Sequence, residues 1–186
     1  MEIDHWIKEI NQVSKQIKEL IAERNFEMLN WKASNKEWSV LQVLDHLKTV
    51  NSSYFPITEN LRSGAYKPPF LGKIDFFVNL FGKLILKSVQ PEEKKKTRTF
   101  PLWQPSFGEA ASSDIDTFFD CQDELITWIT KNADLIKENP VISSPASNNV
   151  VYRFQVVLDI IVAHEKRHLL QIKNTLDEAK SRKKYE

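Results

Sequence analysis

The chain has 186 residues, of which 41% are hydrophobic and 27% are charged, and its formal net charge is +1. We expect residues 1–186 to form a single domain, because this length is enough to bury a substantial apolar core. A net charge so close to zero argues against nucleic acid as a partner, since binding phosphates requires a concentrated basic surface. The only cysteine, Cys121, excludes an intramolecular disulfide and gives no indication of an oxidising compartment.

The sequence predicts neither export nor a membrane span. The N-terminal residues, MEIDHWIKEI, carry charges where a signal peptide requires an apolar stretch. Residues 70–89 form the most apolar segment, but four charged side chains interrupt it too often for a spanning helix. These are Lys73, Asp75, Lys83 and Lys87. We therefore expect a soluble, cytoplasmic protein with no membrane partner.

Apolar residues spaced three and four apart predict helices along most of the chain. The first predicted helix covers residues 4–25, with Asp4 as its N-cap. The second begins after Ser39, which forms a capping-box pattern with Gln42, and its apolar face continues to about residue 62.

Residues 63–111 interrupt this regular pattern and are predicted to form an insertion between bundle helices two and three. SGAYKPP breaks the second helix, residues 70–89 predict an inserted helix, and FPLWQPSFG returns to a loop. Three aromatic residues in this part of the chain could line a pocket or cover the bundle, and we favour covering for most of them. They are Phe100, Trp103 and Phe107.

The remainder of the chain predicts two more bundle helices. The third begins near residues 112–114 and ends before Pro140, and the following segment, NPVISSPASNN, is expected to be a loop. The last helix runs from about residue 151 to the early 180s, and no strand is expected. The predicted fold class is therefore all-α, an antiparallel four-helix bundle with an inserted helix and a long loop between helices two and three.

The last predicted helix carries His164 and His168 four residues apart in AHEKRH, so that both face the bundle interior. His46, in VLDHLK, faces inward from the second helix, and the three rings could meet near one end of the bundle. Buried imidazoles need partners, and a divalent metal is one. The alternative is that each ring bonds its own carbonyl or carboxylate. Gln171 could orient a ligand or bond a neighbouring helix.

The same segment matches the HExxH string of zinc proteases, in which Glu165 would be the general base. That class needs a further ligand downstream, yet no histidine follows His168. It also presents a sheet edge to its substrate, and no sheet is predicted. We therefore expect no protease, and we expect Glu165 to form a surface ion pair with Arg62 or Lys166.

Two segments of the sequence, WSVLQVLDHL and AHEKRHLLQI, resemble the DinB-like superfamily, and the resemblance spans nearly the whole chain. It implies that His46, His164 and His168 form a three-histidine site for nickel or zinc, with open coordination positions. Members similar to this chain include S-transferases and isomerases that use bacillithiol, mycothiol or glutathione, and a few hydrolases.

The leading functional hypothesis is a metal-dependent transferase that activates a low-molecular-weight thiol toward an electrophilic substrate. A metal held by three neutral imidazoles can lower the pKa of a bound thiol or water. The alternatives are a metal-dependent hydrolase, a non-catalytic protein that binds a metal or small ligand, and a scaffold with structural histidines. The apolar helix at residues 70–89 is expected to pack on the bundle, cap the pocket or contact a second subunit of a homodimer.

Overall fold

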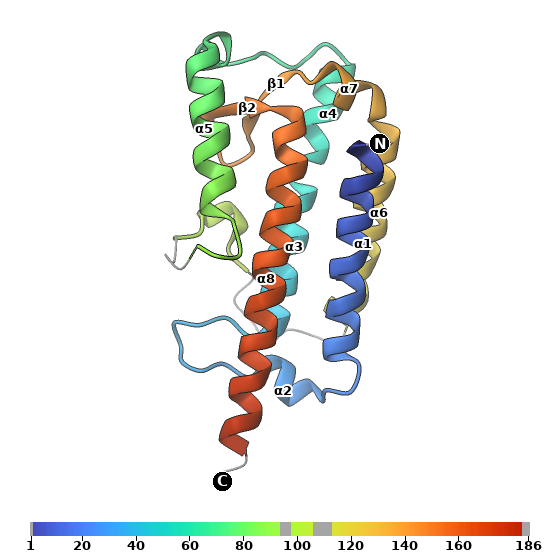
Figure 1. The fold of residues 1–186 in the computed structure, drawn as a ribbon, viewed down its shortest axis with the longest axis vertical. Helices are drawn as coiled ribbons and strands as arrows, with labels where there is room; N and C mark the ends of the chain where they lie inside the picture. Colours follow the sequence, from blue (N-terminus) through green and yellow to red (C-terminus); the bar gives the residue numbers. More distant parts are fainter. Residues whose placement is uncertain (1, 94–97, 106–112, 184–186) are drawn as a thin grey trace.

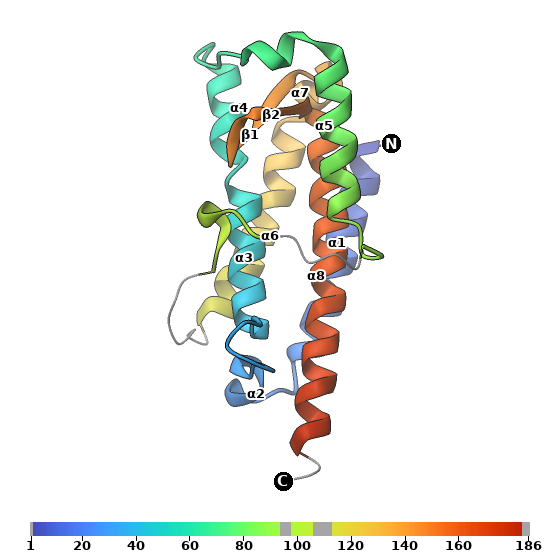
Figure 2. The same ribbon diagram turned by 90° about the vertical axis from the view of Figure 1, so that its left-hand side faces the viewer.

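The computed structural model of the chain describes residues 2–93, 98–105 and 113–183. Four long helices lie side by side, and two of them run opposite to the other two (Figures 1 and 2). They are α1 (Glu2–Ile21) and α8 (Phe154–Lys183) in one direction, and α3 (Val40–Ser52) and α6 (Ser113–Lys131) in the other. The other helices are α2 (Phe26–Asn30), α4 (Phe55–Arg62), α5 (Asp75–Ser88) and α7 (Ala133–Glu138), with 3-10 turns η1 (Phe70–Lys73) and η2 (Pro101–Trp103). The all-α bundle expected from the sequence is confirmed.

The start of α3 follows directly from its capping box. The Ser39 hydroxyl accepts a hydrogen bond from the Gln42 amide at 3.3 Å, and the Gln42 side chain accepts one from the Ser39 amide at 3.1 Å. These bonds satisfy two backbone donors that the first turn of a helix leaves free. The capping box therefore fixes where α3 begins, and with it the face on which His46 lies.

The second predicted helix is two helices in the structure, because α3 ends at Ser52 and α4 begins at Phe55. Pro56 lies in the first turn of α4. It has no amide proton to donate to the carbonyl of Ser52, and its ring would clash with that carbonyl in a continuous helix. The apolar periodicity continues across this break, which explains why the pattern alone did not reveal it.

A β-hairpin replaces the loop expected after residue 139 and the first residues of the expected last helix. Its strands are β1 (Val141–Ser144) and β2 (Ser147–Arg153), paired antiparallel with Ile142 opposite Tyr152. Both of these side chains are fully buried. The prediction that no strand is present was therefore wrong. The strands depend on tertiary contacts that the local sequence does not show, because β2 packs against both η1 and α5. The short, irregular turn between the strands carries no strong hairpin sequence.

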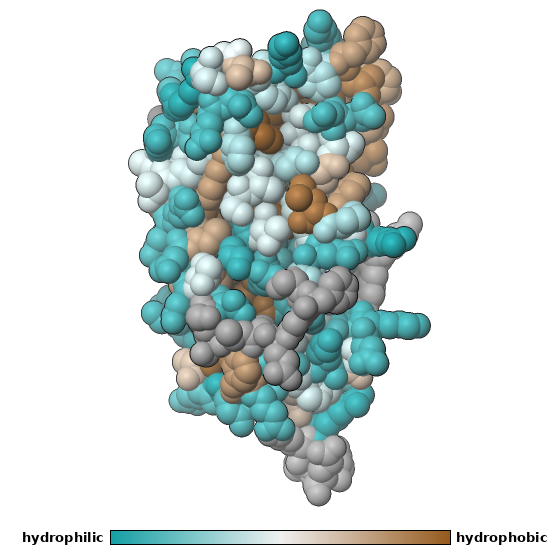
Figure 3. Space-filling model, turned by 180° about the vertical axis from the view of Figure 1, so that it is seen from behind, coloured by the Kyte–Doolittle hydropathy of each residue, from teal (hydrophilic) through white to brown (hydrophobic). Residues whose placement is uncertain are grey.

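The inserted helix is present as α5, which packs against β2 and α8. Gly82 is buried on the inner face of α5, and a Cβ atom there would lie in ordinary van der Waals contact with Val156 Cγ1 at 3.4 Å and Tyr152 Cβ at 3.5 Å. The outer face of α5 remains apolar and exposed, and brown side chains gather there in Figure 3. Phe76, Leu80 and Leu84 belong to this face. Among the described residues, no helix is both long and apolar enough to span a membrane.

The buried apolar residues described in the structure form two clusters along the bundle axis. One contains Trp6, Tyr54, Leu125 and residues 157–158 and 160–162 of α8, and the other contains Ile17, Leu44, Phe118 and Ile172. One stretch of α8 packs in the first cluster and a later stretch packs in the second. The buried polar residues of α8 lie between these two stretches, and α3 and α6 contribute further buried polar residues. They are His46, Asn51, Gln122, Glu165 and His168. A polar layer thus crosses the core between two apolar regions.

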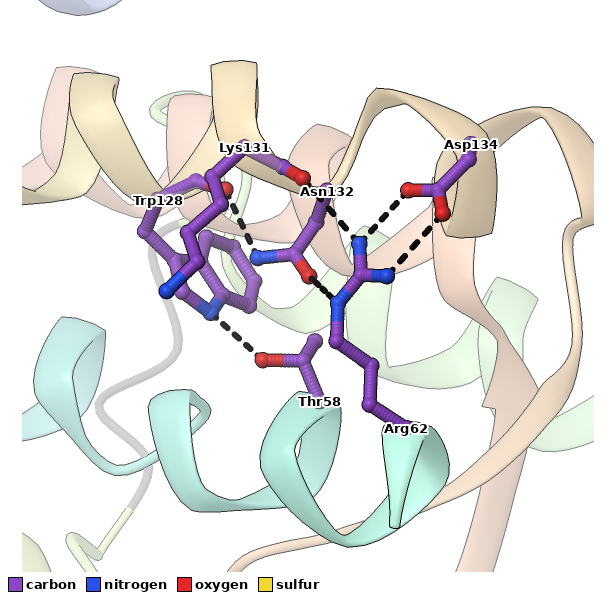
Figure 4. A network of polar contacts seen from close by, with 6 residues as sticks. All are labelled: Thr58, Arg62, Trp128, Lys131, Asn132 and Asp134. Carbon is purple, nitrogen blue, oxygen red and sulfur yellow. Dashed lines mark hydrogen bonds and ion pairs between the residues drawn. The ribbon is translucent and has the colours of Figure 1, made fainter. Parts of the chain in front are cut away.

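A polar network joins α4 to the turn between α6 and α7 (Figure 4). Arg62 donates two hydrogen bonds to the Asp134 carboxylate at 2.6 and 3.0 Å, and further bonds to Asn132 Oδ1 and the Lys131 carbonyl. Asn132 in turn donates to the carbonyl of Trp128. The arginine therefore connects two segments that lie about seventy residues apart in the sequence.

Replacing Thr58 by valine is expected to destabilise this junction. The indole N–H of Trp128 donates to Thr58 Oγ1 at 2.9 Å in a buried position, and valine would leave it without an acceptor. We expect the free energy of unfolding to fall by about 1–3 kcal/mol, measured by urea denaturation. The control is Asp134→Asn, which changes an exposed ion pair and should have a smaller effect. A Thr58→Val protein as stable as the wild type would contradict the assignment.

Candidate metal centre

Three histidines from two helices converge in the polar layer of the core. Nε2 of His164 lies 3.2 Å from Nε2 of His46 and 3.0 Å from Nε2 of His168. One potential ligand atom from each ring lies within 4.8 Å of those of the other two. The structure thus brings together the three predicted residues. The sequence had suggested that they meet near one end of the bundle. In the structure they meet between the two apolar clusters instead.

Hydrogen bonds on the far side of two rings determine which nitrogen carries the proton. Nδ1 of His46 lies 2.6 Å from the Trp103 carbonyl, and Nδ1 of His168 lies 2.8 Å from Oε1 of Gln171. Because both oxygens can only accept, each Nδ1 is the donor. In a neutral ring this leaves the lone pair on Nε2, which points toward the other histidines.

Burial keeps all three imidazoles neutral at physiological pH. Burial first, and the neighbouring rings second, lower the pKa of His168 to about 3 and that of His164 well below its ordinary value. The pKa of His46 is also lowered by burial, although its bond to the Trp103 carbonyl acts in the opposite direction. Neutral imidazoles are the form that binds metal ions.

The three Nε2 atoms cannot all satisfy one another by hydrogen bonding. His46 and His168 both present lone pairs, so His164 can donate from Nε2 to only one of them. Nδ1 of His164 is also buried and has no hydrogen-bond partner among the described residues. A cation bound to all three Nε2 lone pairs removes the conflict among the Nε2 atoms. In a tetrahedral site, zinc–nitrogen distances of about 2.0–2.1 Å correspond to nitrogen separations of roughly 3.3–3.4 Å. The two separations from His164 Nε2, 3.2 and 3.0 Å, are slightly shorter. The donor set is therefore compatible with a metal site.

Glu165 does not form the expected surface ion pair, because its side chain is completely buried. Asn51 donates a hydrogen bond to its Oε1 at 2.8 Å, while Lys166 pairs with Glu9 and Arg62 with Asp134. Burial raises the pKa of Glu165 to about 7, although hydrogen bonds from neighbouring amides partly oppose this rise. The carboxyl group thus belongs to the bundle core.

Replacing Glu165 by glutamine should change how stability depends on pH. The carboxyl pKa is about 7 in the folded protein and about 4.5 unfolded, so wild-type stability from this group is lost as pH rises between these values. Glutamine has no such titration and still offers an oxygen to Asn51. Relative to the wild type, the variant should gain roughly 3 kcal/mol between pH 4.5 and 7.5 in urea unfolding. A difference that stays constant with pH would contradict this.

A small cavity, partly open to solvent, adjoins His164. Trp103 forms part of its wall, its carbonyl accepts from His46, and its indole donates to Ser53 Oγ at 3.1 Å. Trp103 therefore has both of the roles considered for these aromatics, because it lines the cavity and also packs against the apolar core. Phe100 also lines the cavity, and Phe107 lies outside the described residues.

Sequence reasoning missed Trp38, which packs over the histidines. Its ring centroid lies 4.9 Å from that of His46, and it stacks on His168 at 6.4 Å. Its position just before the Ser39 cap, two helical turns from His46, was the available indication.

Cys121 is buried as expected, and its pKa is raised to about 11, mainly by burial. It is therefore a poor nucleophile.

Comparison with known families gives one match. The family model described as the DinB superfamily matches residues 9–172, an interval that contains all three histidines and the hairpin. No match was found among curated proteins, and none among solved structures.

Proposed function

Because the chain belongs to the DinB superfamily and buries three histidines with converging Nε2 atoms, we propose that it is a divalent-metal-dependent thiol transferase. His46, His164 and His168 are the proposed ligands, and nickel or zinc is the proposed ion. When bound, the ion supplies a Lewis acid with at least one open position, which lowers the pKa of a thiol. The convergence of three neutral imidazoles carries this proposal.

The surrounding residues support this role by holding the rings in one protonation state. The Trp103 carbonyl and Gln171 keep the protons of His46 and His168 on Nδ1, so that Nε2 is free to bind. Trp38 packs over the same two rings and limits access of water. These contacts orient the ligands before any substrate arrives.

The nucleophilic sulfur must come from a second molecule. Cys121 is the only thiol in the chain, and it is buried with a pKa raised to about 11. Its Sγ contacts the carbonyl of Lys48 rather than the histidines. A small thiol such as cysteine, glutathione, bacillithiol or mycothiol is the proposed co-substrate, and an electrophilic small molecule is the acceptor.

The test is turnover by metal-loaded protein with each of these thiols and monochlorobimane or 1-chloro-2,4-dinitrobenzene as electrophile. We expect a thiol-dependent rate that disappears after the metal is removed with a chelator. Cys121→Ala is the matched control and should retain this rate. Absence of turnover with every thiol, while elemental analysis shows a full site, would contradict the proposal. Cleavage of 4-nitrophenyl acetate without a thiol would indicate the hydrolase alternative instead.

A further inference from the structure

The cavity beside His164 is lined almost entirely by apolar side chains. The residues that line it come from α3 and the turn after it, α5, β1, β2, α8 and the segment around η2. No Asp, Glu, Lys or Arg is among the lining residues in the described part of the chain. The apolar members are Val50, Ile85, Val89, Phe100, Val150 and Ile160. The cavity therefore offers apolar contacts and no charged group to pair with an ion.

The polar groups in the wall are neutral. The hydroxyls of Tyr54 and Tyr152 lie 2.9 Å apart, so one donates to the other. Burial raises the pKa of Tyr54 well above its ordinary value and that of Tyr152 to about 12, so both remain protonated. Ser144 is a further neutral lining residue. These neutral hydroxyl groups suit a ligand with at most one or two uncharged polar substituents.

We propose that this cavity binds the uncharged, apolar part of the electrophilic substrate and that it excludes the charged thiol. This inference rests on the function proposed above. Moving a carboxylate or ammonium group out of water without a partner is strongly unfavourable. Cysteine and glutathione carry such groups, whereas an aromatic electrophile does not need them.

The α5 helix contributes to this selectivity as one wall of the cavity. Ile85 faces the cavity, whereas its neighbour Leu84 is 52% exposed on the outer face of the same helix. A tryptophan at residue 85 would occupy the cavity, and one at residue 84 would extend into solvent. The two positions therefore form a matched pair that separates loss of space from a general effect on α5.

The experiment measures binding of two probes with the same ring, neutral 4-nitrobenzyl alcohol and anionic 4-nitrobenzoate, by isothermal titration calorimetry. It is performed on metal-free and on metal-loaded protein. We expect the neutral probe to bind metal-free wild type at least tenfold more tightly than the anion. Ile85→Trp should weaken neutral binding at least tenfold, and Leu84→Trp should leave it unchanged. Val150→Phe provides a second way to fill the cavity if Ile85→Trp does not fold.

Three results would overturn the inference: equal affinity for both probes, no binding of the neutral probe, or wild-type affinity in a folded cavity-filling variant. Because binding is measured without metal, failure here differs from failure of the proposed function. A protein that binds the neutral probe but neither binds metal nor turns over thiols would retain the cavity assignment. One that turns over thiols with unchanged kinetics in Ile85→Trp would retain only the transferase assignment.

Discussion

Replacing His168 by alanine is expected to reduce the metal content from about one ion per chain to background after dialysis. The substitution removes one of three converging nitrogen donors, and two donors from the remaining rings cannot hold a divalent ion with comparable affinity. His168 is buried and directs Nε2 to within 3.0 Å of His164 Nε2, so no nearby solvent-exposed histidine can take its place. The measurement is elemental analysis of protein purified without an affinity tag and then offered nickel or zinc.

The matched control for this experiment is His5→Ala. His5 lies on the exposed surface of α1 and outside the triad, so this variant should bind metal as the wild type does. Circular dichroism should show helical content near that of the wild type in both variants. Full metal content in His168→Ala would show that the three-histidine assignment is wrong.

Metal-free protein is expected to lose stability steeply as the pH falls below 6.5. The three histidines have lowered pKa values in the folded chain, down to about 3 for His168, compared with 6.5 when unfolded. Below pH 6.5 the unfolded chain takes up protons on these histidines, whereas the folded chain does not. The stability that the neutral histidines contribute is therefore present above pH 6.5 and is lost as the pH falls. Between pH 6.5 and 5, His168 should remove roughly 1.5 kcal/mol. His46 and His164 act in the same direction, and Glu165 offsets about as much as one imidazole contributes.

Urea denaturation of chelator-treated protein at several pH values measures this loss. His164→Leu should show a shallower dependence on pH than the wild type, because one of the three buried imidazoles is absent. His5→Ala should retain the wild-type dependence, since His5 is exposed. A denaturation midpoint that stays the same from pH 7 to pH 5 would contradict the burial of neutral imidazoles.

Much of the fold could be predicted because helix periodicity and capping are local properties of the sequence. The Ser39 cap was visible in this way, and so was the inserted helix, which was expected at residues 70–89 and is observed at residues 75–88. The hairpin could not be predicted in the same way, because its strands are stabilised by packing against the inserted helix and η1. The bend before α4 depends on one residue, Pro56, within an otherwise continuous apolar pattern.

The three histidines could be found from spacing and inward phase, whereas their supporting contacts could not. The carbonyl of Trp103 reaches His46 from a segment 57 residues away in sequence, a contact that only the tertiary structure creates. Glu165 was misplaced for a related reason. Its neighbours in sequence are charged and polar, but the crossing of α3 over α8 brings Asn51 to it in the core.

X-ray absorption spectroscopy of protein loaded with nickel or zinc tests most directly whether the three rings bind one ion. If the three histidines bind one ion, the first coordination shell of zinc will contain three imidazole nitrogens at about 2.0–2.1 Å, and His46→Ala will reduce that number. A protein that retains neither ion after dialysis, or a bound ion whose spectrum lacks imidazole scattering, would contradict it.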